Sequence, residues 1–189
     1  MFTETPHLII RDLEIEDLSD LLKVSADPDV VQAMDAYLPP DLAGLQRWLT
    51  ETIWHNQQQP RSSHNCAIVL KAESAVIGWI GFGAPSDPTT GDLVLNELST
   101  SELGFGYALN RTYRNRGFVT EATTAILAYC FTVLGAQMVT ASHKRFNTAS
   151  GRVMQKTGMR IRDTDGLTVT NDDEVHYGIT ADDWRIRYH

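Results

Sequence analysis

The stretch 113-YRNRGFVTEATTAILAYC-130 joins a basic, glycine-containing turn to an apolar segment with the composition of a buried helix. The first amide groups of a helix have no intrahelical partner, and the helix dipole favours negative charge there. Gly117 lets the backbone approach a ligand without a Cβ in the way, and Arg114 and Arg116 can add charge-assisted hydrogen bonds. The stretch therefore predicts either an ordinary helix start or a phosphate-binding site.

Two common phosphate motifs do not fit this turn. A P-loop would continue with Gly-Lys-Ser or Gly-Lys-Thr, and a dinucleotide fingerprint would need further glycines at fixed spacing. The basic turn alone is a weak signal, so the elements around it must decide between the two interpretations.

Length, composition and charge limit the function classes. The chain has 189 residues and no repeat, linker or low-complexity tract, so we expect a single domain over residues 1–189. A formal net charge of −8 argues against direct nucleic-acid binding, because duplex binding needs a basic field. No apolar run approaches the roughly 18 residues of a membrane helix, and the N-terminus does not resemble a signal peptide. We therefore expect a cytoplasmic protein without a membrane partner.

The cysteines and histidines give no sign of a metal site. Cys66 and Cys130 lie inside apolar runs of a chain without an export signal, which predicts buried thiols without disulfides. His64 and Cys66 are two residues apart, but no second pair completes a zinc site, so no metal is expected.

Hydrophobic periodicity predicts alternating helices and strands. We expect helices over residues 14–26, 28–34, 41–57 and 147–158, and one after the basic turn that ends at Gly135. We expect strands over residues 7–11, 64–71, 75–84, 100–110 and 137–143, with two more inside 159–180. This order predicts an α/β fold with one sheet of mixed direction. Only the two termini and a turn-rich loop over residues 85–93 suggest disorder.

The turn and its helix resemble the GNAT superfamily of acyl-CoA-dependent N-acyltransferases. The signature of that family is [Q/R]-x-x-G-x-[G/A] at a helix start, and Arg114, Gly117 and Val119 occupy its three fixed positions. Val119 departs from the usual Gly or Ala, which crowds the turn but leaves its N–H group in place. "GFVTEA" (117–122) is similar to "GYATEA" in the branch that includes ribosomal-protein N-terminal acetyltransferases.

Two further segments extend the resemblance along the chain. "NTASGRVMQKTGMR" (147–160) is similar to N-x-x-S-x-x-V-x-x-K-x-G-F in the same branch, and "TPHLIIRDL" (5–13) resembles its opening T-x-R-L-x-L-R. The resemblance is weakest over residues 35–65 and 85–100. It implies a mixed, mostly antiparallel sheet of about seven strands, flanked by helices and splayed where acetyl-CoA binds.

The resemblance also implies how acetyl-CoA binds. The turn amides would hold its pyrophosphate, and the backbone of strand 100–110 would pair with its pantetheine arm. The glycines of that strand, Gly104 and Gly106, suit a bulge or a close backbone approach. The implied cofactor-binding residues are Tyr107, Ala108, Leu109, Arg114, Asn115, Arg116, Gly117, Phe118, Val119, Thr120, Asn147 and Ser150.

The catalytic residues are expected to be Glu102 and Ser150. Many members carry a tyrosine as general acid where this chain has Met154, and relatives in this branch carry a carboxylate where it has Gly104. Glu102 lies two residues before Gly104, on the same face of the strand, and could receive a proton through a water. The counterpart of Ser150 is proposed to donate to the leaving sulfur, and a thiol with a pKa of about 8.5 also leaves reasonably well unprotonated.

These residues also have plain structural interpretations. Asn147 and Ser150 could simply cap the helix over residues 147–157, and Glu102 could be a solvated residue at the strand entry. His143 is an alternative base, although a lone strand histidine is more often a polar edge residue. His176 in the last strand has the same two interpretations.

The expected reaction is direct attack of an amine on the thioester. An α-amine with a pKa of about 7.8 is about a quarter neutral near pH 7.4, whereas a lysine with a pKa of about 10.4 is only about 0.1% neutral. Deprotonation therefore costs about 4 kcal/mol for a lysine and under about 1 kcal/mol for an α-amine. A site without the tyrosine and with a displaced carboxylate favours the α-amine of a protein or peptide N-terminus as acceptor.

Two other functions stay open. The acceptor could be a small-molecule amine such as an amino acid, a polyamine or an aminoglycoside antibiotic. The chain could also be a non-catalytic acyl-CoA-binding or sensing domain. A monomer and a homodimer are both expected possibilities.

Overall fold

The computed structural model describes residues 2–34, 37–84, 101–162 and 173–188. They form two compact units: a first unit of residues 1–82 and 107–125, and a second unit of residues 83–106 and 126–189. Strand β5 (Glu102–Leu109) and helix α4 (Phe118–Thr132) each contribute residues to both units. The expectation of a single domain remains a prediction.

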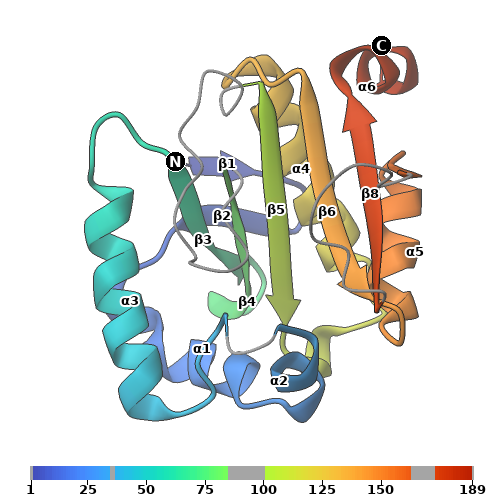
Figure 1. Cartoon of the computed structure of the whole chain (residues 1–189). Helices are drawn as coiled ribbons and strands as arrows, with labels where there is room; N and C mark the ends of the chain where they lie inside the picture. The colour runs from blue at the N-terminus through green and yellow to red at the C-terminus, as the bar shows by residue number, and fades with distance from the viewer. Residues whose placement is uncertain (1, 35–36, 85–100, 163–172, 189) are drawn as a thin grey trace. The chain divides into compact units, whose positions relative to one another are not determined.

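The strands form an eight-stranded sheet in the order β1-β2-β3-β4-β5-β6-β8-β7 (Figure 1). The other strands are β1 (Phe2–Glu4), β2 (Leu8–Asp12), β3 (Ser63–Leu70), β4 (Ala75–Gly83), β6 (Met138–Lys144), β7 (Arg160–Ile161) and β8 (Glu174–Thr180). The β5–β6 pair is parallel, whereas β1–β2, β2–β3, β6–β8 and β7–β8 are antiparallel. The predicted α/β class with a mixed sheet is confirmed, with one strand more than expected.

In the first unit, helices α1 (Leu18–Ser25), α2 (Pro28–Met34) and α3 (Leu42–Asn56) precede β3 and β4. The carboxylate of Asp41 caps α3 by accepting a hydrogen bond from the amide of Gly44. The apolar stripes predicted from the sequence form a core with the sheet, made of Leu21, Val24, Leu45, Leu49, Ala67, Val69 and Trp79. Burial of these stripes holds the helices to the sheet.

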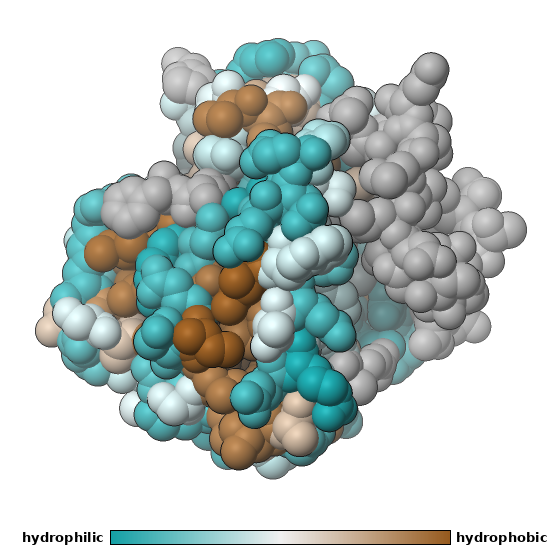
Figure 2. All heavy atoms as spheres, turned by 90° about the vertical axis from the view of Figure 1, so that its left-hand side faces the viewer, coloured by the Kyte–Doolittle hydropathy of each residue, from teal (hydrophilic) through white to brown (hydrophobic). Residues whose placement is uncertain are grey.

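Part of α3 stays exposed. Figure 2 faces the side of the molecule that carries α3, where apolar patches interrupt a polar surface. Leu42 and Trp54 are exposed large side chains of this helix. Trp48, in contrast, packs edge-on against the buried ring of Trp79.

Strands β3 and β4 are buried along nearly their whole length. Their sequences therefore read as continuous apolar runs instead of alternating ones. A Cβ on Gly78 of β4 would lie 2.5 Å from the carbonyl oxygen of Ala108 in β5. Only glycine fits this close backbone approach.

In the second unit, α5 (Thr148–Lys156) packs along β6, and α6 (Ala181–Tyr188) follows β8 directly. The prediction of disorder is wrong for the described residues at both ends of the chain. Strand β1 pairs with β2, and α6 buries Trp184, whose ring lies 5.4 Å from that of Phe131. The loop predicted over residues 85–93 lies outside the described residues.

Both cysteines are buried and free, as predicted. Burial raises the pKa of Cys66 and of Cys130 to about 12, so both thiols stay protonated at neutral pH. No helix among the described residues has the length and apolar character needed to cross a membrane.

The buried His64 makes stability depend on pH. Its ring stacks on that of Phe82 at 4.7 Å, and burial, together with the nearby Arg61, lowers the pKa of His64 to about 4 from 6.5. The unfolded chain therefore binds a proton below pH 6.5 that the folded chain binds only near pH 4. Stability falls over this window as pH drops, by about 3 kcal/mol in total from this group.

His64→Phe should keep the stack and remove most of this loss. Urea unfolding at pH 7, 5.5 and 4 measures it, with His55→Gln on the exposed surface of α3 as the matched control. A His64→Phe variant whose free energy of unfolding falls as steeply as that of the wild type would contradict the assignment.

Candidate functional site

The basic turn lies between the 3-10 helix η2 (Arg111–Tyr113) and the start of α4. Asn115 and Gly117 have positive φ angles of 62° and 86°, so the chain bends sharply twice within three residues. A Cβ placed on Gly117 would meet no described atom within 4 Å, so space is open in front of the helix start. The amide of Glu121 makes the first intrahelical bond, to the carbonyl of Gly117, at 3.0 Å.

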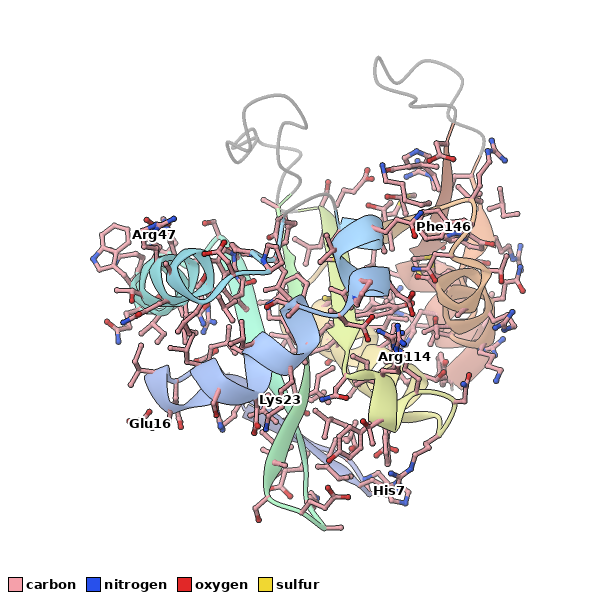
Figure 3. The ribbon with its side chains drawn as sticks, turned by 90° about the horizontal axis from the view of Figure 1, so that it is seen from below. His7, Glu16, Lys23, Arg47, Arg114 and Phe146 are labelled. Atoms are coloured by element: carbon pink, nitrogen blue, oxygen red, sulfur yellow. The ribbon has the colours of Figure 1, made fainter. Side chains whose placement is uncertain are left out.

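Arg114 does not supply its charge to that space. Its guanidinium donates to Asp29 at 2.7 Å and to Asp27 at 3.0 Å, and its Nε donates to the carbonyl of Leu109 at 3.2 Å (Figure 3). Arg111 donates to the same two carboxylates. The first residue of the motif therefore anchors the turn to the start of α2, and any contact of Arg114 with a ligand is left to its backbone.

Asp27 is the centre of this network. It is 8% exposed and also accepts a hydrogen bond from the amide of Asp29 in the first turn of α2. Burial alone would raise the pKa of Asp27, but the Asp29 amide and the guanidinium groups of Arg111 and Arg114 hold it below the ordinary value. The carboxylate therefore stays charged and paired at neutral pH.

Arg116 is placed differently. Its guanidinium lies over the ring of Phe118 at 4.9 Å and over that of Tyr113 at 5.8 Å. The described residues offer it no ion-pair partner, and it is exposed. Of the two arginines in the turn, Arg116 is therefore the one whose donors can meet an anion.

Further contacts fix the turn and the helix start. The hydroxyl of Tyr113 donates to Glu73 at 2.6 Å, in the turn between β3 and β4. Glu121 accepts hydrogen bonds from the Thr5 hydroxyl and from the amide of His7, which is labelled in Figure 3. Sequence patterns carry no information on these contacts, because each contact joins residues that are 40 or more positions apart along the chain.

The last residues of β5 lead straight into this turn within the first unit. Ala108 and Leu109 are buried, and the amide of Asn110 bonds the carbonyl of Ile77 in β4 at 2.9 Å. Along β5, buried and half-buried residues alternate until Gly106 and Tyr107, which are both half-buried. This break in alternation lies where the glycines suggested an irregular strand.

The start of α5 carries Asn147 and Ser150 in the second unit. The side chain of Asn147 caps the helix by accepting a hydrogen bond from the amide of Ser150 at 3.3 Å. Ser150 is 8% exposed. The expected capping role of Asn147 is therefore present, and it does not exclude a contact with a ligand.

His143 lies under α5. Its Nδ1 is 2.8 Å from the carbonyl of Lys144 and therefore donates, which leaves Nε2 as the acceptor. That Nε2 is buried without a partner among the described residues, 2.7 Å from where a Cβ on Gly151 would lie. The neighbouring His176 lies 4.0 Å from Glu174. The enclosed position of His143 does not favour it as a base.

Glu102 lies far from Ser150. It pairs in register with Met138 at the start of β6, whereas Gly151, next to Ser150, lies against His143 near the other end of that strand. Five residue steps separate these levels, which is about 16 Å. Glu102 also faces the side of the sheet opposite His143 and α5, because side chains alternate. The structure therefore does not bring the two expected catalytic residues together.

Glu102 instead forms an ion pair with Arg162, at 3.2 Å. The sequence did not point to Arg162. The described residues contain no group of three or more His, Cys, Asp or Glu side chains that could hold a metal ion.

Known proteins resemble this chain in sequence and in fold. Residues 7–160 match the family model of the acetyltransferase (GNAT) domain. The uncharacterized N-acetyltransferase YnaD of Bacillus subtilis is 25% identical over 188 residues, which cover 97% of this chain and 99% of the relative.

Solved structures share the fold. The GNAT-family acetyltransferase from Bacillus anthracis superposes with a TM-score of 0.77 at 22% identity, over 96% of this chain and 99% of that one. The aminoglycoside acetyltransferase AAC(6')-Ib in complex with coenzyme A superposes with a TM-score of 0.72 at 17% identity, over 95% and 98%. Since the family model spans well over half of the residues, the chain belongs to the GNAT family of acetyl-CoA-dependent N-acetyltransferases.

Proposed function

We propose that this enzyme acetylates the α-amine at the N-terminus of a protein or peptide. The observation that carries the proposal is the wide separation of Glu102 from the start of α5. Little help with deprotonation is then available to the amine, and an α-amine needs little. Met154 lies at the position where many family members have a tyrosine that acts as general acid. Its side chain is buried and has no proton to donate.

Acetyl-CoA would bind along the elements described above. The amides of residues 115–120 would hold the pyrophosphate, with charge from Arg116. The backbone of Tyr107, Ala108 and Leu109 would pair with the pantetheine arm, which Asn147 and Ser150 would also contact. When bound, acetyl-CoA supplies the thioester carbon that the amine attacks.

The proton transfers follow from this arrangement. The amine nitrogen forms the new bond to the carbonyl carbon, the carbon–sulfur bond breaks, and the thiolate leaves with a hydrogen bond from the hydroxyl of Ser150. The proton released by the amine passes through water, and Glu102 is its proposed acceptor. Because Glu102 lies far from the start of α5, its contribution should be smaller than the ~10²–10⁴-fold that well-placed general bases supply.

Substitutions of the two arginines in the turn should have different effects on ligand binding and on stability. Arg116→Gln should weaken acetyl-CoA binding about 10-fold or more, because it removes a charge-assisted contact, and should leave the melting temperature of the free protein unchanged. Arg114→Gln should lower that melting temperature by several degrees, because it leaves the buried Asp27 with one guanidinium fewer.

Isothermal titration and thermal unfolding measure both effects. Equal losses of affinity at unchanged stability in the two variants would contradict the anchoring role of Arg114. Unchanged affinity in Arg116→Gln would place the phosphate contact elsewhere.

Ser150→Ala should lower kcat for peptide acetylation with little change in stability, since Asn147 still caps α5. The effect should be largest when thiolate departure limits the rate. A stopped assay of thiol release measures it, with Thr148→Ala at the exposed start of the same helix as the control. Full activity in a folded Ser150→Ala variant would leave this serine with a structural role only.

The acceptor is tested with a panel of peptides that carry free N-termini, together with lysine side-chain, polyamine and aminoglycoside amines. Free thiol should appear fastest with the N-terminal peptides. Glu102→Gln should slow the amines of high pKa more than those of low pKa. Preference for a small amine would favour the alternative acceptor class, and stabilisation by acetyl-CoA without thiol release from any amine would favour a binding domain.

A further inference from the structure

Strand β4 and the end of β5, which are neighbours in the sheet, approach each other very closely at Gly78 (Figure 1). A Cβ on Gly78 would lie 2.5 Å from the carbonyl oxygen of Ala108 and 3.3 Å from the Cα of Leu109. Both are backbone atoms, so no rotation of a side chain can relieve the contact. Ordinary contacts of this kind are ~3.5 Å long, so a Cβ at position 78 would force the strands apart by about 1 Å.

The close approach lies at the segment that is proposed to bind the pantetheine arm, residues 107–109. Directly after it, the amide of Asn110 donates to the carbonyl of Ile77, next to Gly78, at 2.9 Å. Backbone groups of successive strand residues point to opposite sides, so those of Leu109 point away from β4. These groups are therefore directed to the side on which the arm would pair, while β4 supports the segment from behind.

Strand β4 is less able to move than the end of β5. Every residue of β4 from Val76 to Gly83 is buried, and the indole of Trp79 donates to the side chain of Asn65 in β3 at 3.1 Å. The end of β5, in contrast, leads into a turn whose residues 115–117 are exposed. Because close-packed interiors resist displacement, a side chain at position 78 would move residues 107–109 and leave β4 in place.

The basic turn has a separate anchor. Arg114 joins it to Asp27 and Asp29 at the start of α2, and neither carboxylate belongs to β4 or β5. A displacement of residues 107–109 would therefore change the position of the pantetheine arm more than that of the pyrophosphate.

We infer that Gly78 is a positioning residue for acetyl-CoA: because it has no side chain, it lets residues 107–109 lie where the pantetheine arm can pair with them. This inference rests on the proposed binding of acetyl-CoA. A glycine that only allowed two strands to pack closely would affect stability alone. The two roles differ in one measurable quantity, the affinity that the pantetheine arm adds.

Two ligands measure that quantity, because adenosine 3′-phosphate 5′-diphosphate is coenzyme A without its pantetheine arm. In Gly78→Ala, the affinity for coenzyme A should fall about 10-fold or more, as expected for the loss of one or two hydrogen bonds. The affinity for the nucleotide should change less than about 3-fold, since the turn keeps its anchor. Isothermal titration with both ligands gives the ratio of the two dissociation constants, which should approach one.

Gly81→Ala is the matched control. Gly81 lies in the same buried strand, but a Cβ there would meet the ring of Trp79 and, at 2.9 Å, the side-chain oxygen of Asn65. This variant should lower the melting temperature as Gly78→Ala does and should keep the ratio of the wild type. An equal fall of the ratio in both variants would show that the ratio follows stability, and would overturn the inference.

A second measurement detects the displacement without a ligand. In ¹⁵N-labelled Gly78→Ala, the amide signals of residues 107–110 should shift more than those of residues 66–70 in β3, because β5 moves and the core does not. Equal shifts in both segments would overturn the inference. A Gly78→Ala variant that does not fold would overturn it as well, because the end of β5 would then be unable to relieve the contact.

The titrations also separate this inference from the proposed function. An unchanged ratio in a folded Gly78→Ala variant would overturn the role of Gly78 and leave the proposed function intact. A wild type that binds coenzyme A no more tightly than the nucleotide would overturn the proposed pairing of the pantetheine arm with residues 107–109, and the inference with it.

Discussion

The ion pairs between Arg114 and the carboxylates of Asp27 and Asp29 are the constraint on which the turn proposed to bind acetyl-CoA depends. A loop with two positive φ angles in three residues has many accessible alternatives, and ordering it costs conformational entropy. The network offsets that cost by tying the turn to the first turn of α2 through a nearly buried carboxylate. Because the pairs hold the backbone, the amide groups at the start of α4 keep one direction before any ligand arrives. Preorganised amides of this kind bind an anion without a further ordering cost.

This constraint divides the tasks of the two arginines. Arg114, the residue that matches the family motif, is used inside the protein, whereas Arg116 lies over the rings of Tyr113 and Phe118, and we propose that its donors meet the phosphate groups. Tyr113 and Glu121 add tethers on either side of the turn. In the second unit, Arg162 and Glu102 form an ion pair whose side chains are both partly exposed. The same side-chain type is therefore held in place where it meets a buried carboxylate, and stays accessible to solvent where it meets none.

Much of the fold was predictable because local rules agree with one another along this chain. The apolar stripes determine which faces of α1 and α3 are buried. The basic turn determines where α4 begins, and the glycines Gly135 and Gly158, which have positive φ angles, determine where α4 and α5 end. Strand β1 and helix α6 were missed for a physical reason. A three-residue strand has no measurable period, and α6 buries only Ala181 and Trp184, so its stability comes from tertiary contacts.

The site was predictable only in part. The turn expected at Gly117 is present because such a conformation is encoded locally, whereas the contact of Gly117 with acetyl-CoA stays a prediction. The partners of Arg114 and the path of Arg162 over Gly178 join segments distant in sequence, and periodicity carries no information on such pairs. The separation of Glu102 from Ser150 likewise follows from the β5–β6 register, which residue spacing alone does not determine.

The most direct measurement of the central claim is the change in backbone amide chemical shifts when acetyl-CoA is added to ¹⁵N-labelled protein. The account predicts that the amides of residues 115–120 shift most, and that desulfo-coenzyme A, which keeps the pyrophosphate, shifts the same amides. The side-chain signals of Arg114 should change little, because Asp27 and Asp29 already hold its guanidinium in the free protein and are expected to keep it. Large shifts confined to other parts of the chain, with residues 115–120 unmoved, would contradict the account.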